Sequence, residues 1–370
     1  MKFTCNQQTL TKALNTVSKA VSTRTTIPIL KGILIEAKDG QITMSASDLE
    51  ISIKKTINAD VIKEGSVVVL SKLFGDIIRK LPNEDIVITE TEDNNILIST
   101  SYTEFTVVTM ALDEFPSIGD NQNPISTISL NGELFREMIR KTSFAASVDE
   151  SKGTLVGILT EMTPDSIDMV SLDGFRLAHT SKPMVNGGDC SFIIAAKIMN
   201  ELSKITSDEL DADVVRISLG EKRALVEVGT TEVVIRIMEG DYIRYRDIIP
   251  QDSTTKVTIN RSALLESIER ASLLAKEGKN NLIKMSINDE QIVITSRSEE
   301  GNVKEEIVIE KEGDNLEIGF NSKFVIDSLK AIDDDEIVMY FKSGISPCVI
   351  RPVSGNEYEY LVLPVRIPNM

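Results

Sequence analysis

The stretch Ser71-Lys72-Leu73-Phe74-Gly75-Asp76-Ile77-Ile78-Arg79 carries a pattern that returns twice more along the chain. The second copy is Ala196-Lys197-Ile198-Met199-Asn200-Glu201-Leu202-Ser203-Lys204, and the third is Ser322-Lys323-Phe324-Val325-Ile326-Asp327-Ser328-Leu329-Lys330. Lys72 and Lys197 are 125 residues apart, and Lys197 and Lys323 are 126 apart. Internal periodicity is evidence of repeated architecture, so the sequence predicts three similar domains.

Each copy places two cations on one side of a short helix. A lysine is followed by an apolar residue, by an acid four residues later (Asp76, Glu201, Asp327) and by a second cation after seven residues (Arg79, Lys204, Lys330). Because seven residues make two helical turns, both cations project from one face. One copy alone would be an ordinary solvated surface helix, but three copies in register favour a shared role.

A second helix start also repeats. Asn6, Asn131 and Asn260 each follow a short strand-like segment and precede apolar residues at helical spacing, so each is predicted to be an N-cap. Between the helices, β-branched runs such as 33–35 and 86–88 alternate with turn pairs, which is typical of antiparallel strands. The sequence predicts an α+β fold in which each domain packs two helices on an antiparallel sheet.

The polar, proline-containing segments near 120–124 and 250–253 mark the expected domain boundaries. They predict domains at 1–121, 122–250 and 251–370, each long enough to bury its own core. The connections between them are short, which favours a rigid arrangement.

The charge balance excludes a surface that is basic all over. The 370 residues contain 40 Lys and Arg against 57 Asp and Glu, a net charge of -17. With such an excess of acid, the regularly spaced cations predict that charge is segregated by face. No apolar run approaches the roughly 20 residues of a membrane span, and no apolar segment of a signal peptide follows Lys2. We therefore expect a cytoplasmic protein.

Residues that catalysis would need are scarce. Cys5, Cys190 and Cys348 lie far apart, and His179 is the only histidine, which argues against a zinc site or a Cys/His nucleophile. No glycine-rich phosphate loop is present. The acidic run 333–336 is typical of a solvated turn rather than of a metal site. The sequence predicts a protein that is not an enzyme and holds neither a metal nor a cofactor.

The three repeats with paired cations, the segment Leu172-Asp173-Gly174-Phe175-Arg176-Leu177 and the ending Tyr360-Leu361-Val362-Leu363-Pro364-Val365-Arg366-Ile367 resemble the bacterial DNA polymerase sliding clamps, the beta subunits of DNA polymerase III. The resemblance covers the chain from Phe3 to its last residues. In that family two chains pair head to tail into a six-domain ring, with helices lining the hole. The resemblance implies a nucleoid-associated homodimer that encircles duplex DNA and recruits the replicative polymerase, the clamp loader and repair proteins.

The resemblance also implies which cations face DNA. They are the six cations of the repeated helix, four from the first helices and two from rim loops. The set is Lys12, Arg24, Lys72, Arg79, Arg136, Arg140, Lys152, Lys197, Lys204, Arg270, Lys323 and Lys330. Contact with phosphates gives affinity without sequence preference. Gly153 and Thr154 stand where some relatives have aromatic residues beside the rim lysine.

A pocket for short peptide motifs is implied between the second and third domains. The matching positions are Leu155, Leu172, Gly174, Phe175, Arg176, Leu177, Ile243, Arg246, Ile248, Asn321, Phe324, Ile345, Val362, Leu363, Pro364, Val365 and Arg366. An apolar groove with a few polar anchors suits a linear motif with aliphatic and aromatic side chains. Ile243 replaces a proline of some relatives, and the tail 368–370 extends past the usual end.

Alternatives accompany each of these assignments. For the apolar pocket residues the alternative is core packing, and for Arg176 and Arg366 it is an ion pair. Phe105, Val107, Leu273 and Leu274 are implied in the ring contact, and interior packing is their alternative. For the whole chain the rival is a three-domain scaffold that binds proteins and never encircles DNA, which would leave the matched cations without a role.

Overall fold

The computed structural model describes residues 1–22, 25–118, 124–185, 188–209 and 213–367. The chain divides into two compact units, of which the first comprises Met1–Phe135 with Glu201–Ile237 and the second the remainder. The boundary between the units runs through the central predicted domain, because strands of that domain join sheets with strands of the domain before and of the domain after it. The predicted domain boundary near 120–124 falls largely outside the described residues.

The first unit is built on one antiparallel sheet in the order β10-β15-β16-β17-β4-β3-β2-β6-β9-β8-β7-β1-β5. The β-branched runs predict several of these strands correctly, including those that contain 33–35 and 86–88, and side chains alternate between buried and exposed along the latter. The strands are β1 Lys2–Asn6, β2 Gly32–Lys38, β3 Gln41–Ser47, β4 Ile51–Asn58, β5 Asp60–Lys63, β6 Gly65–Leu70, β7 Asp85–Glu90, β8 Asn95–Ser99, β9 Glu104–Met110, β10 Ser126–Asn131, β15 Val214–Leu219, β16 Arg223–Val228 and β17 Thr231–Arg236.

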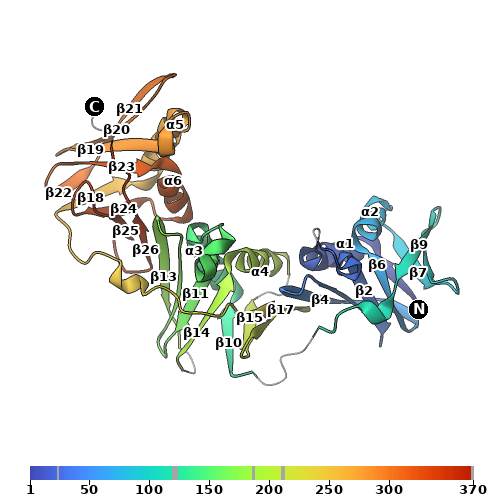
Figure 1. Ribbon diagram of the computed structural model, residues 1–370. Coiled ribbons are helices and arrows are strands. Elements are labelled where there is room, and N and C mark those ends of the chain that lie inside the picture. Colours follow the sequence, from blue (N-terminus) through green and yellow to red (C-terminus); the bar gives the residue numbers. More distant parts are fainter. Residues whose placement is uncertain (23–24, 119–123, 186–187, 210–212, 368–370) are drawn as a thin grey trace. The chain divides into compact units, whose positions relative to one another are not determined.

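Two helices of the first unit, α1 Gln7–Val17 and α2 Ser71–Lys80, pack side by side (Figure 1). Phe74, Ile77 and Ile78 of α2 are buried, whereas Lys72 and Arg79 are exposed. Burying each of these apolar side chains contributes about 1.5–3 kcal/mol, which holds the helix on the sheet with its cations outward. The amphipathic pattern of the opening stretch is thereby confirmed.

The second unit holds two sheets, one in the order β14-β11-β12-β13-β26-β25-β24-β18-β22 and one in the order β21-β20-β19-β23. Helices α5 Arg261–Ala275 and α6 Ser322–Ala331 pack against each other (Figure 1). The strands are β11 Gly157–Met162, β12 Ser166–Leu172, β13 Arg176–Pro183, β14 Cys190–Ala195, β18 Thr255–Asn260, β19 Leu282–Ile287, β20 Gln291–Ser298, β21 Gly301–Val308, β22 Glu310–Gly313, β23 Leu316–Asn321, β24 Glu336–Phe341, β25 Cys348–Pro352 and β26 Tyr358–Val362.

The three predicted N-caps are confirmed. The side-chain oxygen of Asn6 accepts a hydrogen bond from Gln8 N at 3.0 Å, at the start of α1. Asn131 does the same for Glu133 N at 2.9 Å, before α3 Gly132–Thr142. Asn260 caps α5 through Ala263 N at 2.9 Å. Each cap satisfies a backbone N–H that the helix itself leaves unpaired.

Candidate functional site

The first cation of each repeated helix is exposed and has no carboxylate partner among the residues that the structure describes. Lys72, Lys197 and Lys323 lie near the start of α2, of α4 Ala196–Asp208 and of α6, and all three side chains are exposed. Within the described part of the chain, no carboxylate lies within 4.0 Å of their Nζ atoms. Three equivalent lysines are therefore available to an anionic ligand.

The second cations each pair with a nearby acid. Arg79 pairs with Asp76 at 2.7 Å and Lys204 with Glu201 at 2.8 Å, one helical turn earlier on the same face. In the third copy the pattern changes, because Lys330 pairs with Glu269 of α5 at 2.7 Å instead of with Asp327. Exposed pairs of this kind contribute about 0–1 kcal/mol, so a phosphate could displace the acid at little cost.

The cations of the first helices differ in whether their side chains already pair with an acid. Lys12 is exposed on α1. Arg140 donates to Asp333 at 2.5 Å and to the Ala331 carbonyl at 3.0 Å, and Arg270 makes a two-pronged contact with Glu305 at 3.0 and 2.6 Å. Phosphate binding by these two arginines would compete with their acids.

The three remaining residues predicted to contact DNA are Arg136, Lys152 and Arg24. Arg136 is half-buried in α3 and takes part in an interaction within the chain. Lys152 is exposed in the 3₁₀ segment Glu150–Val156, which Asp149 caps through Ser151 N at 3.0 Å. Arg24 lies outside the described residues.

A tight loop after β12 presents Phe175 at the surface. The Oδ1 atom of Asp173 accepts hydrogen bonds from Phe175 N at 2.8 Å and from Arg176 N at 3.0 Å. Gly174 between them has φ +93°, a conformation that favours glycine. The ring of Phe175 is 59% exposed and stacks on Phe324 of α6 with centroids 5.9 Å apart. The loop thus sets an aromatic pair at the surface.

Arg176 is buried and holds this aromatic pair in place. Its Nε donates to Asp173 at 3.1 Å and its Nη1 to Asp327 of α6 at 2.6 Å, while only 8% of the residue is exposed. The guanidinium also lies over the Phe324 ring, 4.8 Å from its centroid. The ion-pair alternative therefore describes Arg176 in the free chain, where it positions its neighbours.

The other predicted pocket residues fall into buried and exposed groups. Leu155, Leu172, Leu177 and Leu363 belong to one apolar cluster, together with Tyr245. Ile243, Ile248 and Ile345 are exposed, the last by 84%. Val362 is 1% exposed in a different core cluster and so offers no surface to a ligand.

Other members of the predicted pocket set make hydrogen bonds within the second unit, through side chains or the backbone. Arg246 donates to Glu161 at 2.8 Å, and Asn321 accepts from Lys323 N at 3.0 Å as the cap of α6. Val365 N donates to the Gly319 carbonyl at 2.8 Å, which fastens the half-buried Pro364 and Val365 to β23. Arg366 is exposed, and the tail 368–370 lies outside the described residues.

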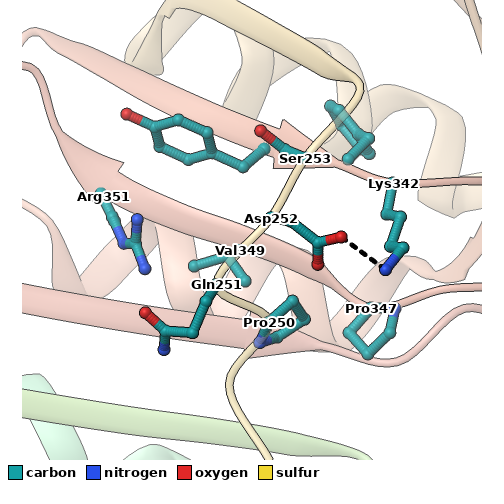
Figure 2. Close-up of a pocket in the computed structure, with 10 residues that line it drawn as sticks. Pro250, Gln251, Asp252, Ser253, Lys342, Pro347, Val349 and Arg351 are labelled. Atoms are coloured by element: carbon teal, nitrogen blue, oxygen red, sulfur yellow. Dashed lines mark hydrogen bonds and ion pairs between the residues drawn. The ribbon is translucent and has the colours of Figure 1, made fainter.

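A small polar cavity lies on the same unit between segment 250–253 and strands β24 and β25 (Figure 2). None of the residues that line it was predicted to form a site; segment 250–253 was predicted as a domain boundary. Lys342 pairs there with Asp252 at 2.6 Å, and Arg351 lies over the Tyr340 ring and donates to Glu359 at 2.6 Å. Both cations are neutralised, so the cavity presents no unpaired charge to a ligand.

The predicted ring-contact residues lie on strand β9 and helix α5. Phe105 of β9 is 40% exposed and Leu273 of α5 is 66% exposed, whereas Leu274 is half-buried. Val107 is buried against its own sheet, and its neighbour Val108, which the sequence analysis did not select, is 72% exposed. Neighbouring residues of a strand point to opposite faces, and at this point of β9, which lies between β6 and β8 in the sheet, the face of Val107 is covered and that of Val108 is open.

Potential metal ligands are scattered in the described part of the chain, and two of its cysteines are buried. No cluster of three His, Cys, Asp or Glu side chains is arranged there to hold a metal, and none of its helices combines the length and apolarity needed to cross a membrane. Burial raises the pKa of the Cys5 thiol to about 11 and also raises the pKa of Cys348. Both thiols stay protonated and are poor nucleophiles.

Comparison with known proteins places these features in one family. Models of the DNA polymerase III beta subunit match residues 1–119 as its N-terminal domain, 129–243 as its central domain and 246–366 as its C-terminal domain. The chain is 34% identical over 377 residues to the beta sliding clamp of Staphylococcus epidermidis and 35% identical over 378 residues to that of Staphylococcus aureus, covering 99% of both chains in each case.

Solved structures agree. The DNA polymerase sliding clamp of Bacillus subtilis superimposes with a TM-score of 0.94 at 33% identity, and the DNA polymerase III beta subunit of Thermotoga maritima with 0.92 at 33%. Each comparison covers 99% of both chains. The resemblance carried by the repeated helices and the chain ending is thereby confirmed. The chain belongs to the DNA polymerase III beta subunit family, the bacterial beta sliding clamps.

Proposed function

We propose that this chain works as a DNA sliding clamp, a homodimeric ring that encircles duplex DNA without sequence preference and tethers the replicative polymerase. The observation that carries the proposal is the equivalence of Lys72, Lys197 and Lys323. Three exposed lysines, none with a carboxylate partner in the described part of the chain, recur on three repeated helices, and the net charge of the chain is -17. A scaffold that binds only proteins would leave these three equivalent lysines without a role.

The cations would contact phosphates of the DNA backbone and make no contact with base edges. Each neutralised phosphate releases counterions, so affinity falls as salt rises, with a slope of about -0.9 per contact on duplex DNA. Contacts limited to phosphates leave all positions along the duplex nearly equal in energy. The clamp can therefore slide, and enclosure rather than tight binding keeps it on DNA. This role needs neither catalysis nor a cofactor.

Ring closure requires two surfaces that a second copy can cover. From Glu104 to Val108, β9 pairs with β8 alone among the described residues, and β21 pairs with β20 alone. Unpaired strand edges readily take up another strand. With domains at 1–121, 122–250 and 251–370, β9 lies in the first domain and β21 in the third, which suits head-to-tail pairing of two copies.

The partner site is proposed at the Phe175 loop and α6. Phe175 and Ile345 supply exposed apolar surface, and Arg176 fixes the aromatic pair behind it. Short motifs with aliphatic and aromatic side chains suit such a surface. Polymerases, the clamp loader and repair proteins would present these motifs at the nucleoid in the cytoplasm.

The test is the triple variant Lys72→Glu, Lys197→Glu, Lys323→Glu on nicked circular DNA. We expect faster loss of the loaded protein from the circle, a shallower salt dependence and weaker stimulation of processive synthesis. The matched control is Lys38→Glu, Lys63→Glu, Lys222→Glu, which changes the net charge equally at exposed strand and turn positions. Equal retention of both variants in low salt would contradict the proposal and favour the scaffold.

A further inference from the structure

The two cations of each repeated helix differ from each other in the same way in all three copies. In the described part of the chain, the first lysine of each copy has no carboxylate within 4.0 Å of its Nζ atom, whereas the cation seven residues later is paired with an acid. The pairs are Arg79 with Asp76 at 2.7 Å, Lys204 with Glu201 at 2.8 Å and Lys330 with Glu269 at 2.7 Å. Each helix thus presents one open cation and, two turns later, one neutralised cation.

The third copy shows that this pairing does not depend on the acid of the same helix. Asp327 lies three residues before Lys330, as the acid does in the other two copies, but its carboxylate binds Arg176 of β13 at 2.6 Å. Lys330 is paired nonetheless, because Glu269 of helix α5 lies 2.7 Å from its Nζ atom. The second cation is therefore neutralised by two different structural routes, which argues against an incidental contact between neighbours on a helix.

Two arginines of the first helices follow the same pattern. Arg140 of α3 binds Asp333 at 2.5 Å, and Arg270 of α5 binds Glu305 at 2.6 Å. The hydrogen bond from Arg270 lowers the pKa of Glu305, so this carboxylate stays ionised at neutral pH. All five paired cations are still accessible, because between 41% and 61% of each side chain is exposed. A phosphate can therefore reach each of them.

We infer that these acids are built-in competitors of the DNA phosphates, which shorten each contact between a paired cation and the duplex and so let the ring slide faster. The inference rests on the proposed function, in which the cations face DNA. Carboxylates and phosphates both accept charge-assisted hydrogen bonds from ammonium and guanidinium groups. When a cation leaves a phosphate, the acid beside it takes the place of that phosphate. The new ion pair offsets part of the cost of release, so each step along the duplex costs less.

The balance of charges predicts how the lining responds when the acids are removed. With the acids in place, the paired cations add little net attraction, and the three open lysines supply most of the positive potential at the duplex. Freed cations would make further phosphate contacts, and each contact releases counterions and steepens the dependence on salt. Stronger contacts also widen the energy difference between a cation on a phosphate and one between phosphates. The lining would then bind DNA more tightly and slide more slowly.

The test frees the second cation of each repeated helix through Asp76→Asn, Glu201→Gln and Glu269→Gln in the full chain. The Kd for a short linear duplex, which can enter the ring from its ends, is measured by fluorescence anisotropy at several salt concentrations. We expect a Kd about tenfold lower than that of the wild type in low salt and a salt slope steeper by about 0.9 for each freed cation. Once loaded on long duplex DNA and followed as single molecules, the variant should also diffuse more slowly.

The matched control frees three cations on other elements of the chain. It combines Glu50→Gln, Asp252→Asn and Glu312→Gln. These changes remove the same number of charges and release Arg236, Lys342 and Lys256 from exposed ion pairs. Because these cations lie outside the repeated helices, the Kd for the duplex should stay within about twofold of the wild-type value. Equal Kd values and salt slopes for the two variants would overturn the inference, as would weaker binding by the first variant.

A conservative variant separates charge from structure. Asp76→Glu with Glu201→Asp and Glu269→Asp keeps the three acids and should bind the duplex as the wild type does. A Kd as low as that of the neutral variant would overturn the inference, because the acids would then act through the shape of the helices.

The triple lysine variant of the proposed function, measured in the same assay, separates the two proposals. If it loses binding while the neutral variant and its control agree, only this inference fails. If it binds the duplex as tightly as the wild type, the DNA-facing role of the repeated helices fails as well.

Discussion

Arg176 and Asp327 form an ion pair, with Nη1 2.6 Å from Oδ2, that ties the Phe175 loop to helix α6. The same helix carries Lys323 and Lys330, so the residue pair joins the proposed partner surface to the proposed DNA surface. In the first and second repeated helices the equivalent acids, Asp76 and Glu201, bind the second cation of their own helix instead. The third helix has exchanged that local contact for a contact with the loop.

Replacing Asp327 by Asn should loosen α6. The substitution leaves the buried guanidinium of Arg176 with Asp173 as its carboxylate partner, and breaking a buried pair from one side is strongly unfavourable. We expect the free energy of local opening of α6, measured by amide hydrogen exchange, to fall by about 1–3 kcal/mol. Asp76→Asn in α2 breaks an exposed pair and serves as the control, with an expected change below about 1 kcal/mol. Equal losses in the two helices would show that the Arg176 contact does not fasten α6.

Replacing Phe175 and Ile345 by Ala should weaken the binding of a short peptide with adjacent leucine and phenylalanine side chains. Both residues are largely exposed, so the loss should appear in affinity, at least about tenfold by calorimetry, with little change in thermal stability. Leu177 and Val362 are poorer choices for substitution because they are buried, and truncating them would leave a cavity in the core. Ile62→Ala with Val353→Ala removes comparable exposed apolar surface elsewhere and should bind normally. Unchanged affinity of the Phe175 and Ile345 variant would refute the assignment of this surface.

Replacing Glu137 by Gln should destabilise the second unit in a pH-dependent way. Burial alone would raise the pKa of Glu137, but the contacts with Lys141 at 2.6 Å and Lys182 at 3.3 Å outweigh it and lower the pKa. A carboxyl whose pKa is lowered by folding adds stability above its unfolded value of 4.5, and this stability is lost as pH falls through the folded pKa. The difference between wild type and variant, about 1–3 kcal/mol at neutral pH, should shrink below about pH 4 in denaturant unfolding. A difference that stayed constant down to pH 3 would mean that Glu137 acts through packing rather than charge.

Local patterns along the chain were sufficient for the helices, their caps and most strands. Apolar residues at helical spacing must be buried wherever the helix packs, so Phe74 and Ile78 predict the buried side of α2 and thereby the outward direction of Lys72. Asn6, Asn131 and Asn260 act on backbone N–H groups two or three residues away, which needs no information from the rest of the fold. The period of about 125 residues then implied three copies of one architecture.

Contacts between residues distant in sequence were decided only by the tertiary structure. Whether the cation seven residues after the first lysine binds an acid of its own helix or of a neighbour depends on which elements lie alongside. In α6, Asp327 binds Arg176 of β13, and Lys330 binds Glu269 of helix α5. Burial likewise separates Val107 from Val108, because it depends on which side of β9 is covered. The amino-acid sequence thus determined the repeated helices and their outward cations, since these follow from short-range periodicity. The fold determined which charges are neutralised and which strand edges stay open, since pairing across a sheet joins residues that no local pattern connects.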